Sequence, residues 1–336
     1  MLEFTIFIVF VALVFDFLNG MNDAANSIAT IVSTRVLSPK LAVAWAAFFN
    51  FAAAFFFGVK VATTIGKGIV EPSIVNPELI LSALVGAIIW THLCTYYGLP
   101  ISVSHSLIGG LAGSAVSKAG FSVLIPSGLI KVGIFIFLSP LIGLILGFIF
   151  MVIVLWIVRK SSSYKVDKVF RIGQLLSSAA FSLGHGTNDA QKTMGIIAIL
   201  LYSGGYLGNE FYVPFWVVIS AHTTIALGTL YGGWKVVRTM GMRLTHLQPV
   251  GGFCAETAGA LVLIGTALAG IPVSTTHTVA GGIMGVGATK GLRAVRWGVA
   301  NKIVWAWILT IPISGLVGYI SYAIIDFFFV LFNITF

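Results

Sequence analysis

The sequence is poor in charged residues for its length. Only 9% of its 336 residues are charged, and 58% are hydrophobic. A soluble domain uses about 25% charged residues to cover its surface, so this chain lacks the polar material to coat a globule in water. Apolar runs such as residues 41–57 and 132–158 approach or exceed the roughly 20 residues that a helix needs to cross a bilayer. The composition therefore predicts an all-α polytopic membrane protein.

Features of several other classes of protein are scarce as well. The two cysteines, Cys94 and Cys254, lie in apolar segments and have no metal-ligand spacing. The first apolar run, residues 4–17, has no basic segment before it and no small-residue cleavage site after it, so we expect a membrane helix rather than a signal peptide. The net charge of +9 does not indicate nucleic-acid binding, because the sequence has no basic, aromatic-interleaved surface. We instead assign the basic residues to loops, where they set the orientation in the membrane.

Motifs of enzymes and of ATP-driven pumps are also missing. The sequence has no Gly-x-x-x-x-Gly-Lys loop, so ATP does not drive it directly. An intramembrane hydrolase is disfavoured, because neither a His-Glu-x-x-His pair nor a Gly-x-Ser-Gly nucleophile turn occurs. We expect a protein that is not an enzyme and has no cofactor.

Three blocks of sequence occur twice, in the same order and with nearly the same spacing between the two copies. They are Gly20–Ala24 and Gly186–Ala190, Lys60–Thr64 and Lys235–Thr239, and Gly98–Ser106 and Gly270–Thr278. The second match is weaker than the others. Three matches in register predict two related halves, residues 1–158 and 172–336.

The charge of the loops indicates how the two halves are oriented. The segment between them, residues 159–171, carries five basic residues and is predicted to be a cytoplasmic linker. Loops of the second half carry more basic residues than the equivalent loops of the first half. The second-half residues are Lys235, Arg238, Arg243, Lys290, Arg293, Arg296 and Lys302, against Lys60, Lys67, Lys118 and Lys131. This asymmetry predicts inverted-topology repeats. We expect a multi-pass protein of the cell (inner) membrane with both termini on the outer side.

The third repeated block predicts an anion site. In each half a Gly-x-Pro stop precedes Ser, Thr and His residues and then a short, glycine-bearing apolar run, which is typical of a re-entrant half-helix hairpin. The N-terminus of a helix offers unpaired N–H groups and a positive pole. Two such ends near the bilayer midplane, where inverted repeats place their substrate site, could bind a tetrahedral oxyanion. Whether His105 and His277 contact the substrate or pack the helices stays open.

The first repeated block predicts cation sites at helix breaks. Carboxylates and amides at membrane depth are costly and indicate function, and their oxygens suit a hard monovalent cation. The residues are Asn22, Asp23 and Asn26 in one half, Asn188 and Asp189 in the other, and Glu256 from a later segment. Lys192 could pair with Asp189 or meet the anion, and Asp16 and Asn50 could simply hold the bundle together. His92, His185 and His222 are expected to be structural.

At these residues the sequence resembles the inorganic phosphate transporter (PiT) family, over nearly its full length. The family carries a Gly-x-Asn-Asp motif in each half and a Gly-x-Pro-x-Ser-x-Thr-His motif further on; Ser104 replaces the Thr in the first half. The resemblance implies uptake of inorganic phosphate driven by sodium or protons, inverted repeats of about 10–12 membrane segments with broken helices and two re-entrant hairpins, external termini and a homodimer. Asn50 and Asp16 follow its bacterial members, whereas Glu256 matches the sodium-coupled branch.

The resemblance also assigns roles position by position. The expected phosphate ligands are Ser102, Ser104, His105, Ser106, Ser274, Thr275, Thr276, His277, Thr278, Asn22, Asn188 and Lys192. The expected sodium ligands are Asn22, Asp23, Asn26, Asn188, Asp189, Glu256, Ser104 and Thr276. We expect symport of phosphate with sodium across the lipid bilayer. The alternatives are a proton-coupled phosphate or metal–phosphate symporter and, less favoured, a sulfate transporter or a passive anion channel.

Overall fold

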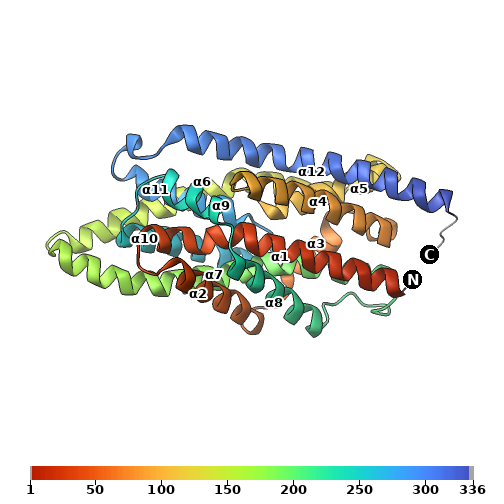
Figure 1. Cartoon of the computed structure of the whole chain (residues 1–336), viewed down its shortest axis with the longest axis horizontal. Coiled ribbons are helices and arrows are strands. Elements are labelled where there is room, and N and C mark those ends of the chain that lie inside the picture. The colour runs from red at the N-terminus through yellow and green to blue at the C-terminus, as the bar shows by residue number, and fades with distance from the viewer. Residues whose placement is uncertain (1, 333–336) are drawn as a thin grey trace.

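Twelve α-helices account for most of residues 2–332, the part of the chain that this computed structural model describes (Figure 1). They are α1 Leu2–Ser33, α2 Pro39–Ala52, α3 Lys60–Gly68, α4 Pro77–Tyr97, α5 Val103–Ala119, α6 Pro126–Val158, α7 Ser163–Ser203, α8 Phe215–Tyr231, α9 Trp234–Arg238, α10 Pro249–Leu268, α11 Thr275–Ala288 and α12 Trp297–Leu331. A π-helical turn, Thr239–Arg243, continues α9, and short 3-10 turns lie at Ala53–Phe55, Pro72–Ile74, Phe121–Val123 and Leu292–Ala294. The expectation of an all-α protein is confirmed.

Five of the described helices, α1, α4, α6, α10 and α12, are long and apolar enough to cross a membrane, and the number rises to seven if each bent helix pair is one span. The bent pairs are Pro39–Phe55 with Lys60–Gly68, at 82°, and Phe215–Tyr231 with Trp234–Arg243, at 65°. Broken helices are therefore present, but the breaks predicted at the two Asn-Asp blocks are wrong: these blocks lie inside the continuous helices α1 and α7. The 41-residue helix α7 is not among the five, and its centre carries the second Asn-Asp block.

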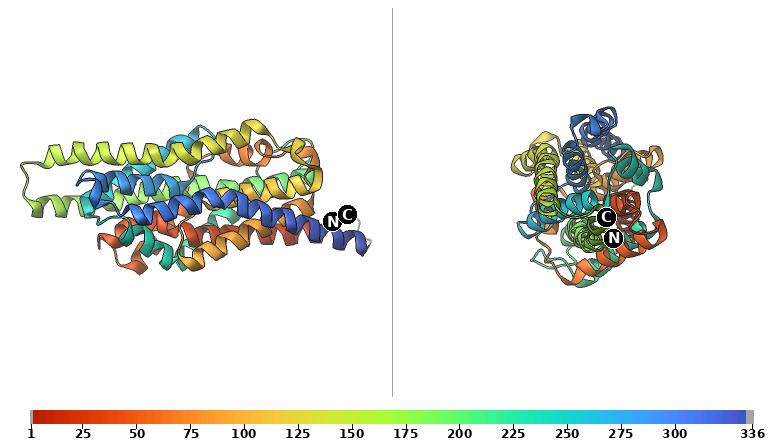
Figure 2. Two further views of the ribbon diagram at one scale, coloured as in Figure 1. Left: turned by 90° about the horizontal axis from the view of Figure 1, so that it is seen from above. Right: turned by 90° about the vertical axis from the view of Figure 1, so that its left-hand side faces the viewer.

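The two halves run in opposite directions along the bundle. Figures 1 and 2 show both termini at one end of the molecule and the turn between α6 and α7 at the other. We call these the termini end and the linker end. Six helices lie on each side of this turn, and α7 begins at Ser163, so residues 163–171 of the expected linker are helical. Because α1 leaves the termini end and α7 returns to it, the repeats are inverted.

Equivalent glycines make equivalent contacts in the two halves. A Cβ at Gly20 on α1 would lie 2.1 Å from the carbonyl oxygen of Ile225 on α8, and one at Gly186 on α7 would lie 2.6 Å from that of Asn50 on α2. Asn50 and Ile225 are equivalent positions, because they are as far apart in the chain as the two lysines that begin the second repeated block. The glycine of each Gly-x-Asn-Asp motif therefore lets two helices approach more closely than any larger residue allows.

The helices α5 and α11 point their N-termini into the bundle. The 33-residue helix α6 runs from the termini end to the linker end, so α5, which ends just before it, enters from the termini end. By the same reasoning α11, which ends just before α12, enters from the linker end. The hairpins α4–α5 and α10–α11 are therefore the two expected re-entrant pieces, and α5 packs on α12 as α11 packs on α6.

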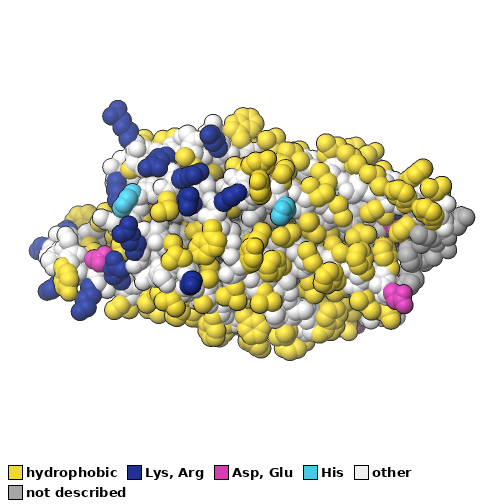
Figure 3. Space-filling view, in the orientation of Figure 1, with side chains coloured by type: hydrophobic (Ala, Val, Ile, Leu, Met, Phe, Trp, Pro, Cys, Tyr) yellow, Lys and Arg dark blue, Asp and Glu magenta, His cyan; other side chains and the backbone are white. Residues whose placement is uncertain are grey.

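A polar layer lies between two apolar cores. Along α1, Ile8 and Phe15 belong to one core cluster and Ala25 and Ile28 to another, with the first Asn-Asp block between them. Along α7, Phe181 belongs to the second cluster, while Ala190 and Met194 belong to the first. The outer surface is largely apolar, as the space-filling view shows (Figure 3). Together these features fit a multi-pass membrane protein with its site near mid-depth.

Candidate functional site

The N-termini of α5 and α11 meet at the centre of the bundle and are capped in the same way. Ser102 Oγ accepts from the His105 N–H at 3.3 Å, and Ser274 Oγ accepts from the His277 N–H at 3.2 Å. The two histidine rings lie edge to face with centroids 5.0 Å apart. The pseudo-symmetry of the sequence thus places two positive helix poles side by side, as an anion site requires.

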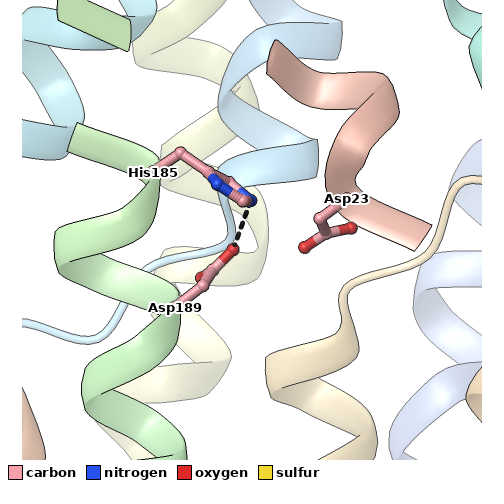
Figure 4. Close-up of side chains that lie close together, drawn as sticks. All are labelled: Asp23, His185 and Asp189. Carbon is pink, nitrogen blue, oxygen red and sulfur yellow. Dashed lines mark ion pairs between the residues drawn. The ribbon is translucent and has the colours of Figure 1, made fainter. Parts of the chain in front are cut away.

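Two carboxylates and one imidazole lie beside these helix ends. Ligand atoms of Asp23 on α1 and of His185 and Asp189 on α7 all lie within 4.8 Å of one another (Figure 4). Asp23 is 2% exposed, and His185 and Asp189 are fully buried. Carboxylates so close together in a buried site repel each other, so the cluster favours a cation or a proton between them.

Threonines at the start of α11 join the anion-binding helix end to the carboxylates. The Thr275 hydroxyl lies 2.9 Å from Asp189 Oδ2 and 3.4 Å from Asp23 Oδ2, and the Thr276 hydroxyl lies 3.2 Å from Asp23 Oδ1. Asn26 Nδ2 donates to both threonine hydroxyls, at 3.2 and 2.9 Å. The first Asn-Asp block and the second Ser/Thr-His block, which lie in opposite halves of the sequence, therefore form one site.

Lys192 joins the remaining two blocks. Its buried ammonium group contacts Asp189 Oδ1 and Ser104 Oγ, and it donates to the Val273 carbonyl at 2.9 Å. The sequence left open whether this lysine pairs with Asp189 or lies at the anion site. It pairs with Asp189, and the ion pair lies next to the N-terminus of α5, where the sequence predicts the anion site.

Three amide side chains leave an oxygen without a partner at this centre. Asn22 Nδ2 donates to the Thr95 hydroxyl at 2.6 Å, and Asn188 Nδ2 donates to carbonyls of residues 184 and 263 at 2.9 and 2.8 Å. In Asn22, Asn26 and Asn188 alike, the amide nitrogen donates the hydrogen bonds. Their buried Oδ1 atoms have no hydrogen-bond partner among the described residues. A buried acceptor without a donor is costly, so each of these oxygens is a candidate ligand for a cation.

His185 is the residue at this centre that the sequence missed. Its Nε2 lies 3.0 Å from Asp189 Oδ2, and its Nδ1 lies 3.1 Å from Asn50 Oδ1. Asn50 Nδ2 in turn donates to the Thr229 hydroxyl at 3.0 Å. A signal was present in the sequence, because His185 and Asp189 stand one helical turn apart and so share a helix face.

Glu256 does not join the Asp23–Asp189 cluster. On α10 its Oε1 accepts from the Thr30 hydroxyl at 2.5 Å and from Gln174 Nε2 at 3.0 Å, while its Oε2 accepts from Ser177. Thr30 lies two turns beyond Asp23 towards the linker end of α1, so this fully buried carboxylate forms a second polar cluster on that side.

Several other candidates contact helices around the site. His277 stacks on Trp307, with ring centroids 3.9 Å apart, and its Nδ1 lies 3.2 Å from the Ile136 carbonyl. The Thr278 hydroxyl donates to the carbonyl of residue 274, in its own helix, at 2.9 Å. Ser106 Oγ is buried and has no partner among the described residues. Both histidines of the repeated block therefore make packing contacts in the structure: they pack against each other, and His277 also packs on Trp307.

The centre is closed from both ends of the bundle. Among the candidates at the meeting helix ends, Ser104 is the most exposed at 7%. Two aspartates and one lysine leave one net negative charge there when His185 is neutral. An anion 4 Å from an uncompensated carboxylate would be opposed by about 4 kcal/mol at an effective dielectric near 20. A second cation in the site would remove this repulsion, and anion and cation binding would then depend on each other.

Comparison with known proteins relates nearly the whole chain to phosphate transporters. A sequence profile of the phosphate transporter family matches twice, at residues 19–166 and 159–318. The chain is 56% identical over 316 residues to a Rhizobium meliloti protein, with 94% of this chain and 95% of that one covered, and 43% identical over 331 residues to one from Bacillus subtilis, with 98% and 99% covered. Both are named probable low-affinity inorganic phosphate transporters. A solved structure titled "The sodium-dependent phosphate transporter" superposes with a TM-score of 0.87 at 27% identity, covering 97% of this chain and 99% of that one.

Proposed function

The chain belongs to the phosphate transporter family, and we propose that it imports inorganic phosphate by symport with sodium ions. One observation carries this proposal. Anion-type donors at two helix N-termini and cation-type oxygens from two Asn-Asp blocks are interleaved in one closed site, through Thr275, Thr276 and Lys192. Neither kind of ion can bind there without changing the electrostatic energy of the other.

The roles of the individual residues follow from their contacts. The ammonium of Lys192 and the hydroxyls and N–H groups at the starts of α5 and α11 would bind phosphate. The unpartnered oxygens of Asn22, Asn26 and Asn188, with the Asp23 and Asp189 carboxylates, would bind sodium. Hydroxyls that now face carboxylates, such as Thr275, can rotate to serve either ion. Sodium bound at Asp23 then lowers the repulsion that phosphate meets.

Proton coupling is a second candidate, and His185 favours it. The imidazole lies between the Asn50 amide and the Asp189 carboxylate, so a titratable group stands in contact with the carboxylate that pairs with Lys192. A proton there would neutralise the site as sodium does.

Phosphate uptake into proteoliposomes separates these functions. Labelled phosphate is supplied under an inward sodium gradient, then under a proton gradient, with sulfate and divalent metals as competitors. Accumulation above the outside concentration under the sodium gradient alone supports the proposal. Accumulation driven only by protons would replace sodium with protons, and equilibration without accumulation would indicate a channel.

The orientation in the inner membrane, with the termini outside, is part of the proposal. Lysine and arginine side chains gather towards the linker end in the space-filling view (Figure 3). Residues 159–171, which lie around the turn between α6 and α7 at that end, include five basic residues. Cytoplasmic loops carry such an excess, so we place the linker end in the cytoplasm. A homodimer is proposed from the family resemblance alone.

A further inference from the structure

The second repeated block, Lys60–Thr64 and Lys235–Thr239, has no part in the proposed ion site. In the sequence it served as one of the three repeated blocks and supplied loop charges to the argument for orientation, but it received no role of its own. In the structure Lys60 begins α3, and Lys235 lies in the first turn of α9, so both lie just beyond the bend of a broken helix. Figure 1 shows α3 towards the termini end and α9 towards the linker end.

Each copy of the block binds the hairpin of the opposite half. Lys60 Nζ donates to the carbonyl of Leu268 at 3.1 Å, and the Thr64 hydroxyl donates to that of Gly270 at 2.9 Å. In the other half, Lys235 Nζ donates to the carbonyl of residue 96 at 2.9 Å, and the Thr239 hydroxyl to that of residue 98 at 2.9 Å. The accepting residues are themselves equivalent, because each pair occupies the same two places relative to the Gly-x-Pro stop of its own half.

The glycines at these junctions fit this arrangement. Gly98 and Gly270 both have a φ of 69°, which a residue with a side chain rarely adopts. A Cβ at Gly98 would lie 3.0 Å from Cβ of Lys235, and one at Gly270 would lie 3.2 Å from Cβ of Lys60. The Gly-x-Pro stop of each hairpin is thus shaped to receive the lysine of the other half.

The lysines are placed where a cation is most useful. α4 ends at Tyr97 and α10 at Leu268, so each ammonium lies at the negative pole of a helix, beside carbonyls that have no partner in the next turn. Lys235 also lies over the Tyr96 ring, 4.2 Å from its centroid. A merely solvated loop charge would not bind the end of a hairpin helix in both halves.

These contacts lead directly to the anion site. Only residues 269–273 separate Leu268, at the clamped end of α10, from Ser274, the N-cap of α11. Donors bind three carbonyls between the end of α10 and the start of α11: Lys60 at residue 268, Thr64 at residue 270 and Lys192 at residue 273. In the first half the carbonyl of residue 101 accepts from Thr276 at 3.0 Å, and that of residue 100 from Trp307 at 3.0 Å.

α3 is in turn fixed to the cation-binding helix. Gln191 Oε1, next to Lys192 on α7, accepts from the N–H groups of Val61 and Ala62 at 2.8 and 3.2 Å. The tip of the α10–α11 hairpin is therefore held in a fixed position relative to α7, with α3 as the connecting element.

We infer that Lys60 with Thr64, and Lys235 with Thr239, are two positioning clamps, each of which holds the anion-binding hairpin of the other half in register with the ion site. The clamps contact neither phosphate nor sodium. They set the distance between two helix N-termini, on which the affinity for an anion depends steeply. The inference deepens the proposed phosphate transport and rests on it.

The test measures phosphate KM and maximal rate in proteoliposomes for Lys60→Met and Lys235→Met. Because both lysines are exposed, loss of one such hydrogen bond should raise KM by about two- to fivefold, with the maximal rate changed much less. Lys→Arg at the same positions should recover most of the affinity, because a guanidinium keeps the charge and the donor. The smaller changes Thr64→Val and Thr239→Val should raise KM less, and they keep the test valid if a lysine variant fails to fold.

Matched controls exist in the same chain. Lys290 also donates to a backbone carbonyl, that of His246 at 3.2 Å, and Thr63 donates within its own helix to Val59 at 3.3 Å. Lys290→Met and Thr63→Val should leave KM unchanged. The inference is overturned if the clamp variants keep the wild-type KM, or if the controls shift it equally. Failure of wild-type protein to accumulate phosphate would instead refute the proposed function.

Discussion

The replacement Asp23→Asn tests which carboxylate the coupling ion needs. Asp189 is paired with Lys192, whereas Asp23 receives only threonine hydroxyls, at 3.2 and 3.4 Å. Asp23 is therefore the carboxylate whose charge is left uncompensated. A cation about 4 Å from it gains about 4 kcal/mol at an effective dielectric near 20, which corresponds to roughly a thousandfold in affinity. Because asparagine keeps the shape, the loss should fall mainly on sodium binding.

The expected result is loss of sodium-driven uptake with little loss of stability. In Asp23→Asn, the sodium concentration for half-maximal phosphate uptake should rise at least about a hundredfold, allowing for relaxation of neighbouring oxygens. Purified protein should melt near the wild-type temperature in choline chloride but lose the stabilisation that sodium chloride gives the wild type. The readouts are labelled-phosphate uptake and thermal unfolding in detergent.

Two further variants bound the interpretation. Asp189→Asn should instead destabilise the protein by about 3–5 kcal/mol, because it leaves the buried ammonium of Lys192 without its counterion. Asp167→Asn, which breaks only the exposed 2.8 Å pair with Arg171, should change neither property. The reasoning is wrong if Asp23→Asn transports with the wild-type sodium dependence, or if the two central variants behave alike.

Three other predictions test separate parts of the structure. Glu256→Gln should weaken sodium activation without changing phosphate KM at saturating sodium, because this carboxylate lies outside the central cluster; a raised KM under those conditions would contradict that placement. Gly186→Ala should lower the melting temperature, because its Cβ would lie 2.6 Å from the Asn50 carbonyl oxygen and overpacking costs about 1–3 kcal/mol; Gly265→Ala, which meets nothing within 4 Å, is the control. In intact cells Lys160→Cys should resist an impermeant thiol reagent and react after permeabilisation, because we place the linker end in the cytoplasm. Both native cysteines are buried, so they should add no background labelling. Labelling from outside would reverse the proposed orientation.

The fold was predictable because its signals repeat. Three blocks matched in order and at nearly constant spacing predicted two halves, and the inverted arrangement is confirmed. Broken helices are present, but at the second repeated block and not at the Asn-Asp blocks, which lie inside continuous helices. Short-range rules also predicted a helix start in the Ser/Thr-His block after each Gly-x-Pro stop, and the structure has an N-cap there in each half, at Ser102 and at Ser274. Several motifs that occur twice in the same order are not expected by chance, and helix capping depends only on residues that are close in the chain.

The parts of the site that lacked a repeat were harder to predict. Single polar residues such as Gln174, Ser177 and Thr30 gave no pattern, and their convergence on Glu256 depends on the packing of three helices. His185 has no histidine counterpart in the first half, where Asn19 occupies the equivalent place just before the Gly-x-Asn-Asp motif, so comparison of the halves did not single it out. The assignments of phosphate and sodium ligands stay predictions until the variants are measured.

The departures from symmetry give a physical reason for the coupling that we propose. Lys192 and Asn26 occupy equivalent places after the two Gly-x-Asn-Asp motifs, so the positive charge occurs in one half only. With a lysine in both halves, each aspartate would have its own counterion and phosphate would bind without help. With none, two uncompensated carboxylates would exclude the anion. One lysine neutralises Asp189 and leaves Asp23, so the inverted frame supplies a symmetric pair of anion-binding helix ends while the broken symmetry leaves one negative charge for the travelling cation to neutralise.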